Sequence, residues 1–288
     1  MGTWCPRVSH LLAGAFSLLC LTSTAGAQGG RLYGMIDIDA GFGQDIAFSV
    51  ELGGAHTVRY FTWGRELDEV EGMAIDGDGE LYLFAETGVV KKVRLAQPDA
   101  RPVTVAQLSG LDLTSATSRP TDALIELFDA RGGQFITFDP RTDAYLNAPR
   151  WSTRTKAPQL NGLARTATRL YGTAEGRERL ELYACTEAGC ERACAGRVNV
   201  TRDVQAIERL TDGTLLLART SITPALQVVL HVETLDPAAC RVSPLATVQL
   251  DREQVRGFLK PGLDLDRVLR QARRLNRAPQ IEAIAIQR

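Results

Sequence analysis

The pattern of apolar and polar positions repeats along the chain in short segments. In each segment a polar residue precedes a Gly or Ala and then a large aliphatic residue. After four of the five, a break containing Asp, Gly or Thr separates the segment from a second apolar run. The five segments begin at Glu71, Ser109, Asn161, Gln205 and Glu282. Internal repeats spaced by a few tens of residues indicate a fold built from similar stacked units.

Short runs with strand character lie between these repeats and are bounded by Gly, Asp or Pro. They comprise residues 81–84, 103–106, 135–138, 180–183, 215–218 and 228–232. Many short strands with regular turn signals predict an all-β sandwich, barrel or propeller. The repeat favours the propeller, in which similar four-stranded blades surround a central channel. We therefore predict an all-β fold, a β-propeller with five clear blades.

The interval before the last repeat is longer than the other intervals, and residues 251–277 fill it. Val268, Ala272 and Leu275 recur there at the spacing of one helix face. We expect a short helical insertion before the last strand. A sixth, degenerate blade is the alternative explanation.

The last repeat, residues 281–286, leaves no room for the other strands of its blade. Residues 31–34, Arg-Leu-Tyr-Gly, match residues 169–172 inside an internal blade. Pairing the terminal segments would remove two unpaired strand edges at once. We expect the N- and C-terminal strands to close the ring in this way.

The N-terminus has the features of a secretory signal. A short apolar core, Leu11–Leu21, precedes the small-residue cleavage site Ala25-Gly26-Ala27. We expect a signal peptide over residues 1–27 and a single propeller domain over residues 28–288. No later segment approaches the roughly 20 apolar residues of a spanning helix. The sequence thus predicts a secreted or periplasmic protein with no membrane span.

The charge and composition of the chain limit the classes of partner that it can bind. The chain has 33 Lys and Arg against 34 Asp and Glu, whereas a nucleic-acid-binding domain carries a basic stripe. We therefore exclude nucleic acid as a partner. Arg far outnumbers Lys, which is typical of a GC-rich bacterial genome and favours a bacterial source.

Four cysteines remain after signal cleavage: Cys185, Cys190, Cys194 and Cys240. An even number in an exported protein predicts disulfides. Cys190 and Cys240 follow equivalent strands of successive blades, so we favour 190 with 240 and 185 with 194. The pairing of 185 with 190 and 194 with 240 remains an alternative.

The repeat places five polar side chains at one position per blade: Glu71, Ser109, Asn161, Gln205 and Glu282. If the repeat is the innermost strand, these groups form a ring near one mouth of the channel. Carboxylate, amide and hydroxyl oxygens suit Ca²⁺, with Glu71, Asn161, Gln205 and Glu282 as candidate ligands and Ser109 beside them. The alternative is a polar ring that only satisfies backbone donors around a hydrated channel.

Residues 159–163, Gln-Leu-Asn-Gly-Leu, resemble a segment of the gluconolactonase-type lactonases, which are six-bladed and calcium-dependent. Residues 70–74 and 280–285 are similar to the Glu-Gly-hydrophobic-Ala strands of the esterase-like phytase propellers. These resemblances imply that Asn161 and either Glu71 or Glu282 bind a metal. Leu160 stands where the lactonases carry Pro, and the blade count is lower than theirs.

Two functions fit the sequence. The first is an exported binding or scaffolding module for a protein or glycan partner. The alternative is a calcium-dependent hydrolase of lactones or phosphoesters, in which the cation polarises the scissile group and activates a water. No His lies near any repeat, and candidate catalytic acids are few, so the binding module is preferred.

Overall fold

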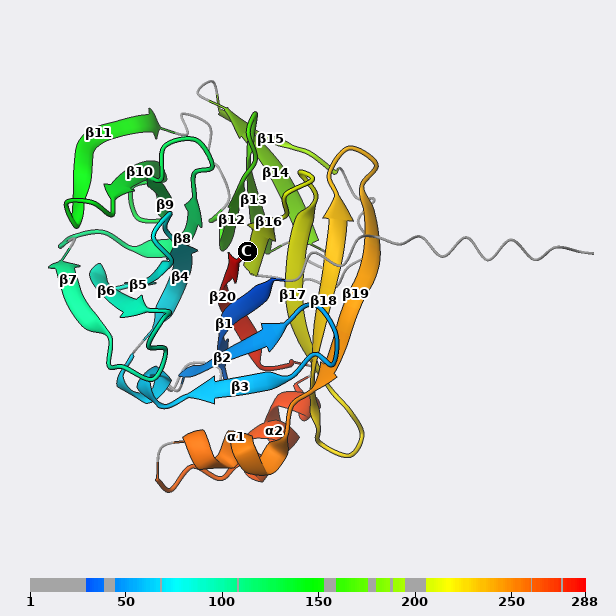
Figure 1. Ribbon diagram of the computed structural model, residues 1–288. Coiled ribbons are helices and arrows are strands. Elements are labelled where there is room, and N and C mark those ends of the chain that lie inside the picture. Colours follow the sequence, from blue (N-terminus) through cyan, green and yellow to red (C-terminus); the bar gives the residue numbers. More distant parts are fainter. Residues whose placement is uncertain are drawn as a thin grey trace, which may run out of the picture.

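The computed structural model describes residues 30–38, 45–67, 69–107, 109–152, 159–175, 180–186, 189–194, 206–259, 261–275 and 277–288. The expected signal peptide and Gln205 lie outside these residues. In the described part of the chain, twenty strands form five four-stranded antiparallel sheets arranged around a central channel (Figure 1). The predicted five-bladed β-propeller is therefore confirmed, and a sixth blade is not needed.

Blade 1 combines the two ends of the described chain. Its strands, from the channel outwards, are β20 (Gln280–Gln287), β1 (Arg31–Asp37), β2 (Asp45–Glu51) and β3 (Val58–Phe61). β20 pairs with β1 along its whole length, from Gln287 opposite Arg31 to Gln280 opposite Asp37. The predicted closure by terminal strands is therefore present. A 3₁₀ helix, η1 (Thr62–Glu66), follows β3.

The other four blades follow in chain order, each with its first strand innermost. Blade 2 contains β4 (Val70–Ile75), β5 (Glu80–Ala85), β6 (Val89–Arg94) and β7 (Val103–Gln107). Blade 3 contains β8 (Leu113–Ser118), β9 (Ile125–Asp129), β10 (Gln134–Asp139) and β11 (Ala144–Ser152). Blade 4 contains β12 (Gly162–Arg165), β13 (Leu170–Glu175), β14 (Leu180–Thr186) and β15 (Gly189–Arg192). Blade 5 contains β16 (Ala206–Arg209), β17 (Leu215–Ile222), β18 (Val228–Asp236) and β19 (Arg241–Gln249).

The innermost strands form the wall of the channel. Each contacts the innermost strand of the next blade, and β16 contacts β20 to complete the ring. The apolar cores lie between successive blades. Blade 2, for example, packs Phe84 and Tyr82 against Phe138 of blade 3.

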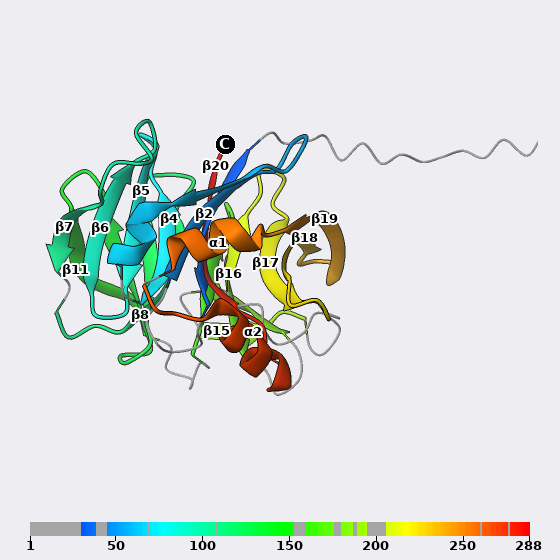
Figure 2. The ribbon, with the colours of Figure 1, turned by 90° about the horizontal axis from the view of Figure 1, so that it is seen from below.

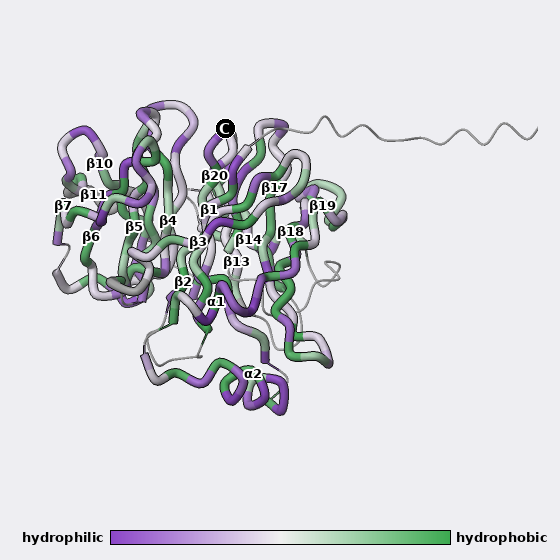
Figure 3. Tube along the Cα trace, turned by 60° about the horizontal axis from the view of Figure 1, so that its bottom comes forward, coloured by the Kyte–Doolittle hydropathy of each residue, from purple (hydrophilic) through white to green (hydrophobic). Residues whose placement is uncertain are grey.

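The predicted helical insertion consists of α1 (Arg252–Phe258) and α2 (Leu265–Arg274). Asp251 and Asp264 cap their N-termini by accepting backbone N–H hydrogen bonds. Leu265 and Leu269 are buried against the core between blades 1 and 5, and the opposite face of α2 is hydrophilic (Figure 3). The helices therefore lie outside the ring, below β3 in Figure 1, and Figure 2 shows them from below.

The four cysteines among the described residues are all paired, but the favoured connectivity is wrong. Cys185 bonds to Cys190 and Cys194 to Cys240. Cys185 on β14 and Cys190 on β15 are directly opposed in the hairpin, with Cα atoms 4.0 Å apart. Cys190 is itself one leg of this hairpin, so Cys194, beyond it, is the residue left to link blade 4 to blade 5.

Candidate functional site: the two mouths of the channel

The innermost strands all run in the same direction, so equivalent residues meet at the same mouth. The mouth at the start of these strands, here the acidic mouth, has a cavity of about 360 Å³. Its lining includes Glu71 of β4, Thr114 of β8, Glu282 of β20 and Asn161, which directly precedes β12. The structure thus brings together three of the residues that the repeat placed in one ring.

Ser109 does not join this group. It is exposed in a turn before β8, next to Gly110, whose φ of +85° is a left-handed conformation. The fourth position of the ring belongs to Thr114, whose hydroxyl donates to Leu160 O at 2.8 Å. The sequence comparison missed Thr114 because β8, Leu-Thr-Ser-Ala-Thr-Ser, lacks the large aliphatic residue of the other repeats.

Glu71 and Glu282 form the centre of the acidic mouth. Burial, followed by the neighbouring carboxylates of Asp45 and Glu86, raises the pKa of Glu71 to about 8. Burial, the charge of Glu71 and a hydrogen bond to Glu71 raise the pKa of Glu282 well above its usual range. Both shifts favour the protonated carboxyl form, so they support one proton held between Glu71 and Glu282 at neutral pH.

Other groups around this pair make the mouth strongly polar. Asp37, Glu86 and Asp112 add three carboxyl groups to the lining, and Arg277 adds a guanidinium group. Asp45 lies behind the pair and accepts the Val70 N–H at 3.2 Å. Among the described residues, none forms a hydrogen bond with the buried side-chain oxygen of Asn161. An oxygen left unsatisfied at a polar cavity is available to a ligand or a water.

The candidate calcium ligands are only partly assembled. Glu71, Asn161 and Glu282 share the mouth, whereas Gln205 is outside the described residues. Among the described residues, no group of three or more His, Cys, Asp and Glu side chains is arranged to hold a metal ion. Oxygen donors suit Ca²⁺ in chemistry, but a cation here would have to displace the proton that Glu71 and Glu282 share.

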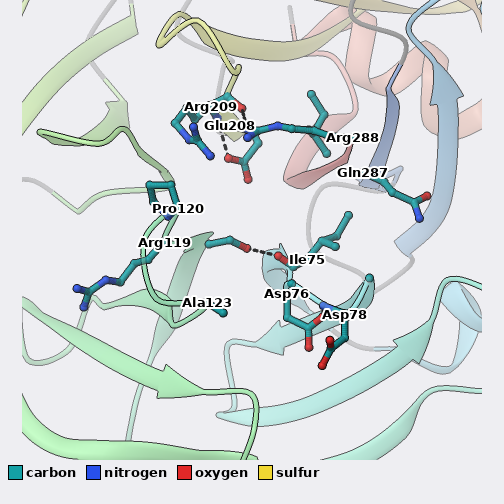
Figure 4. Close-up of a pocket in the computed structure, with 14 residues that line it drawn as sticks. Ile75, Asp76, Asp78, Arg119, Pro120, Ala123, Glu208, Arg209, Gln287 and Arg288 are labelled. Atoms are coloured by element: carbon teal, nitrogen blue, oxygen red, sulfur yellow. Dashed lines mark hydrogen bonds between the residues drawn. The ribbon is translucent and has the colours of Figure 1, made fainter.

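The opposite mouth of the channel, here the mixed mouth, was not anticipated as a site. Its cavity has a volume of about 520 Å³ and lies between the first hairpins of blades 2 and 3 and the ends of β16 and β20. Figure 4 shows Glu208 directed into this cavity near Arg209 and Arg288. The side chain of Glu208 is 6 % exposed. Burial raises the pKa of this carboxyl group to about 7, opposed by the Arg209 N–H hydrogen bond and the nearby guanidinium groups.

Comparisons with known proteins support the fold only. No protein-family model matches the chain, and no curated protein matches its sequence. A chain from the crystal structure of a nidogen/laminin complex matches with a TM-score of 0.51 and 12 % identity, covering 90 % of this chain and 98 % of that one. A protein of unknown function from Bacteroides thetaiotaomicron matches with a TM-score of 0.48 and 13 % identity, covering 77 % of this chain and 59 % of that one.

These findings give no evidence for the expected resemblance to lactonases or phytases. The blade count also differs from the six blades of the lactonases. What the comparisons and the structure share is the β-propeller fold.

Two features of the protein bear on its cellular compartment. Two disulfides are consistent with an extracellular or periplasmic protein, because such bonds persist in oxidising surroundings. In the described part of the chain, no helix is long and apolar enough to cross a membrane.

Proposed function

We propose that the protein is an exported bacterial binding module that holds a protein partner at the acidic mouth. The observation that carries this proposal is the carboxyl pair of the partly buried Glu71 and the buried Glu282, beside the unsatisfied oxygen of Asn161. Keeping two carboxyl groups in a shared, partly dehydrated site costs folding free energy. Such a cost is typical of functional sites.

The charges of the acidic mouth favour a cationic group on the partner. Five carboxyl groups line the cavity against one guanidinium group, Arg277. A Lys or Arg side chain that entered the cavity would replace the shared proton and pair with the ionised carboxylates. A propeller chain in a nidogen/laminin complex shows that a protein of this fold occurs in a protein assembly.

The test compares capture by the wild-type protein with capture by the Glu71→Gln/Glu282→Gln double variant. A protein from the native source should cross-link to the acidic mouth of the wild-type protein. The double variant should not capture this protein. Glu191→Gln, an exposed substitution on β15, is the matched control and should retain the partner. Equal capture by the double variant would contradict the proposal.

A calcium-dependent hydrolase of lactones or phosphoesters is the second candidate. It is favoured by one observation, the unsatisfied oxygen of Asn161 beside two carboxyl groups. Glu71, Asn161 and Glu282 would hold the cation, which would polarise a scissile group and activate a water. Titration calorimetry with CaCl₂ separates the candidates, since the hydrolase requires calcium heat that the double variant loses.

A further inference from the structure

One position on the innermost strands distinguishes blade 5 from the other blades. The residues that occupy it are Ala74, Thr117, Ala164, Glu208 and Ala285, as the registers with the second strands show. Four blades thus carry a small side chain where blade 5 carries a carboxylate. A large acidic group is not needed to build a blade, because the other four do without it.

Glu208 is held at the wall of the mixed mouth by its own backbone. One of its carboxylate oxygens accepts the Arg209 N–H at 2.7 Å. Within the part of the chain that the structure describes, no side chain donates to the second oxygen, which faces the cavity (Figure 4). This oxygen is an acceptor on a residue of which only 6 % is exposed to solvent.

Two guanidinium groups lie close enough to act on Glu208 without pairing with it. Arg288 and Arg209 both lower its pKa through their charges. Among the described residues, neither forms a salt bridge with Glu208. Arg288 instead donates to the backbone carbonyl of Arg209, and no acceptor in the described part of the chain pairs with the buried Nε of Arg209. The guanidinium groups of Arg209 and Arg288, which are donors, and the carboxyl group of Glu208, which is an acceptor, therefore line the same cavity.

The mixed charges around this cavity favour a neutral ligand over a strongly charged one. The lining is balanced, with three acidic and three basic side chains: Asp76, Asp78, Glu208, Arg119, Arg209 and Arg288. A cation would be repelled by the two arginines beside Glu208, and an anion by Glu208 and by the aspartates across the cavity. A neutral ligand that both donates and accepts hydrogen bonds avoids both penalties. Hydroxyl groups have this property.

We propose that the mixed mouth binds a neutral saccharide, whose adjacent hydroxyl groups bridge Glu208 and the guanidinium groups of Arg209 and Arg288. One hydroxyl donates to the free carboxylate oxygen, and its neighbour accepts from an arginine. The cavity volume of about 520 Å³ is in the range of small-molecule sites. This proposal is independent of the protein-binding function assigned to the acidic mouth.

Saturation-transfer NMR and titration calorimetry test the proposal with glucose, galactose, mannose, maltose and lactose as probes. We expect at least one of these saccharides to bind the wild-type protein. At pH 8, where Glu208 is mostly ionised, Glu208→Ala should weaken that binding roughly tenfold or more, because it removes a hydrogen bond to a charged group. This variant introduces the residue that three other blades carry at the same position, so it should fold.

Two controls make the result decisive. The Glu71→Gln/Glu282→Gln variant of the acidic mouth should bind saccharide as the wild type does, even where it loses a protein partner. Inorganic phosphate and acetate should not compete with the saccharide. The proposal is overturned if none of the five saccharides binds, if Glu208→Ala binds them equally well, or if phosphate occupies the site instead.

Discussion

Close approach of neighbouring innermost strands explains the small residue that recurs in the repeat. A Cβ atom added to Gly72 of β4 would lie 3.0 Å from the Cβ atom of Ala116 and 3.0 Å from its backbone nitrogen, both in β8. The equivalent residues of the other blades are Ser115, Gly162, Ala206 and Ala283. The small residue is thus a packing requirement of the ring.

Gly72→Val should therefore destabilise the protein by about 1–3 kcal/mol, the usual cost of overpacking. Gly257 in α1 provides the control, because nothing lies within 4 Å of a Cβ added there. Gly257→Ala should stabilise the protein by about 0.5–1 kcal/mol, since glycine is unfavourable inside a helix. Urea unfolding of both variants measures these effects, and a neutral Gly72→Val would contradict the packing argument.

The carboxyl group of Glu208 should make stability depend on pH. Its pKa is about 7 in the folded protein against a reference value of 4.5. The folded state therefore retains the proton longer than the unfolded state, and stability falls as pH rises from about 4.5 to 7. The full difference corresponds to about 3 kcal/mol.

Glu208→Ala should remove this loss. Its free energy of unfolding should exceed that of the wild type at pH 8, and the difference should shrink towards pH 4.5. Glu191→Gln, on the exposed face of β15, should leave the wild-type pH dependence unchanged. Thermal melts at pH 4.5, 6 and 8 measure the effect. A constant difference across this range would show that Glu208 does not titrate as the buried site requires.

Residue-level prediction succeeded where a side chain carries its own signal. Glu71, Asn161 and Glu282 stand before small and aliphatic residues, so the repeat places them at one mouth. The repeat did not identify Thr114, because its strand is mostly polar. It did not identify Glu208 either, because only the first polar residue of each segment was compared between blades. Neither the shared proton of Glu71 and Glu282 nor the cavity beside Glu208 follows from spacing, since both depend on contacts between blades.

At the scale of elements, the two disulfides connect different parts of the fold. Cys185–Cys190 joins the two strands of one hairpin and spans 5 residues, whereas Cys194–Cys240 joins blade 4 to blade 5 and spans 46 residues. In the chain-entropy model, stabilisation grows with loop length, to about 2 kcal/mol for the short loop and about 4 kcal/mol for the long one.

The Cys194→Ser/Cys240→Ser variant should therefore lose more stability than the Cys185→Ser/Cys190→Ser variant. Guanidinium unfolding of the two oxidised double variants gives the comparison directly. Equal losses would indicate that the bond between blades does not restrict the unfolded chain as its loop length implies. Non-reducing peptide mapping, in which Cys194 and Cys240 peptides remain linked, checks the pairing itself.

Strands and helices were predicted well because each has a local signal. Val268 and Ala272 are spaced for a helix and lie in α2, and Asp251 and Asp264 supply the caps. The disulfide pairing had no such signal. It depends on where β15 begins after its turn, and a short strand containing Gly189, Cys190 and Glu191 has little apolar pattern to mark it.

At the scale of the whole molecule, the ring is closed by one strand. β20 pairs with β1 on one side and contacts both neighbouring innermost strands, β4 and β16. It also contributes Ile281 and Ile284 to the core between blades 1 and 5, and Ala283 and Ala285 to the core between blades 1 and 2. The number of blades was predictable from the repeat, and the closure from the matching of terminal segments to one blade.

Deletion of residues 280–288 should consequently unfold the protein as a whole. The truncated chain would expose the edge of β1 and open two cores that are otherwise sealed, so the loss cannot be confined to one end. We expect its near-ultraviolet circular dichroism signal to be lost at 25 °C and its thermal melt to show no cooperative transition.

In a matched control protein, the same nine residues are moved to the N-terminus and joined to Gly30 by a short Gly/Ser linker. This arrangement supplies β20 from the other end of the chain. This permuted protein should recover the cooperative transition, because the ring needs the strand and not its original connection. A truncated protein that melts like the wild type would show that the ring does not depend on β20 for closure.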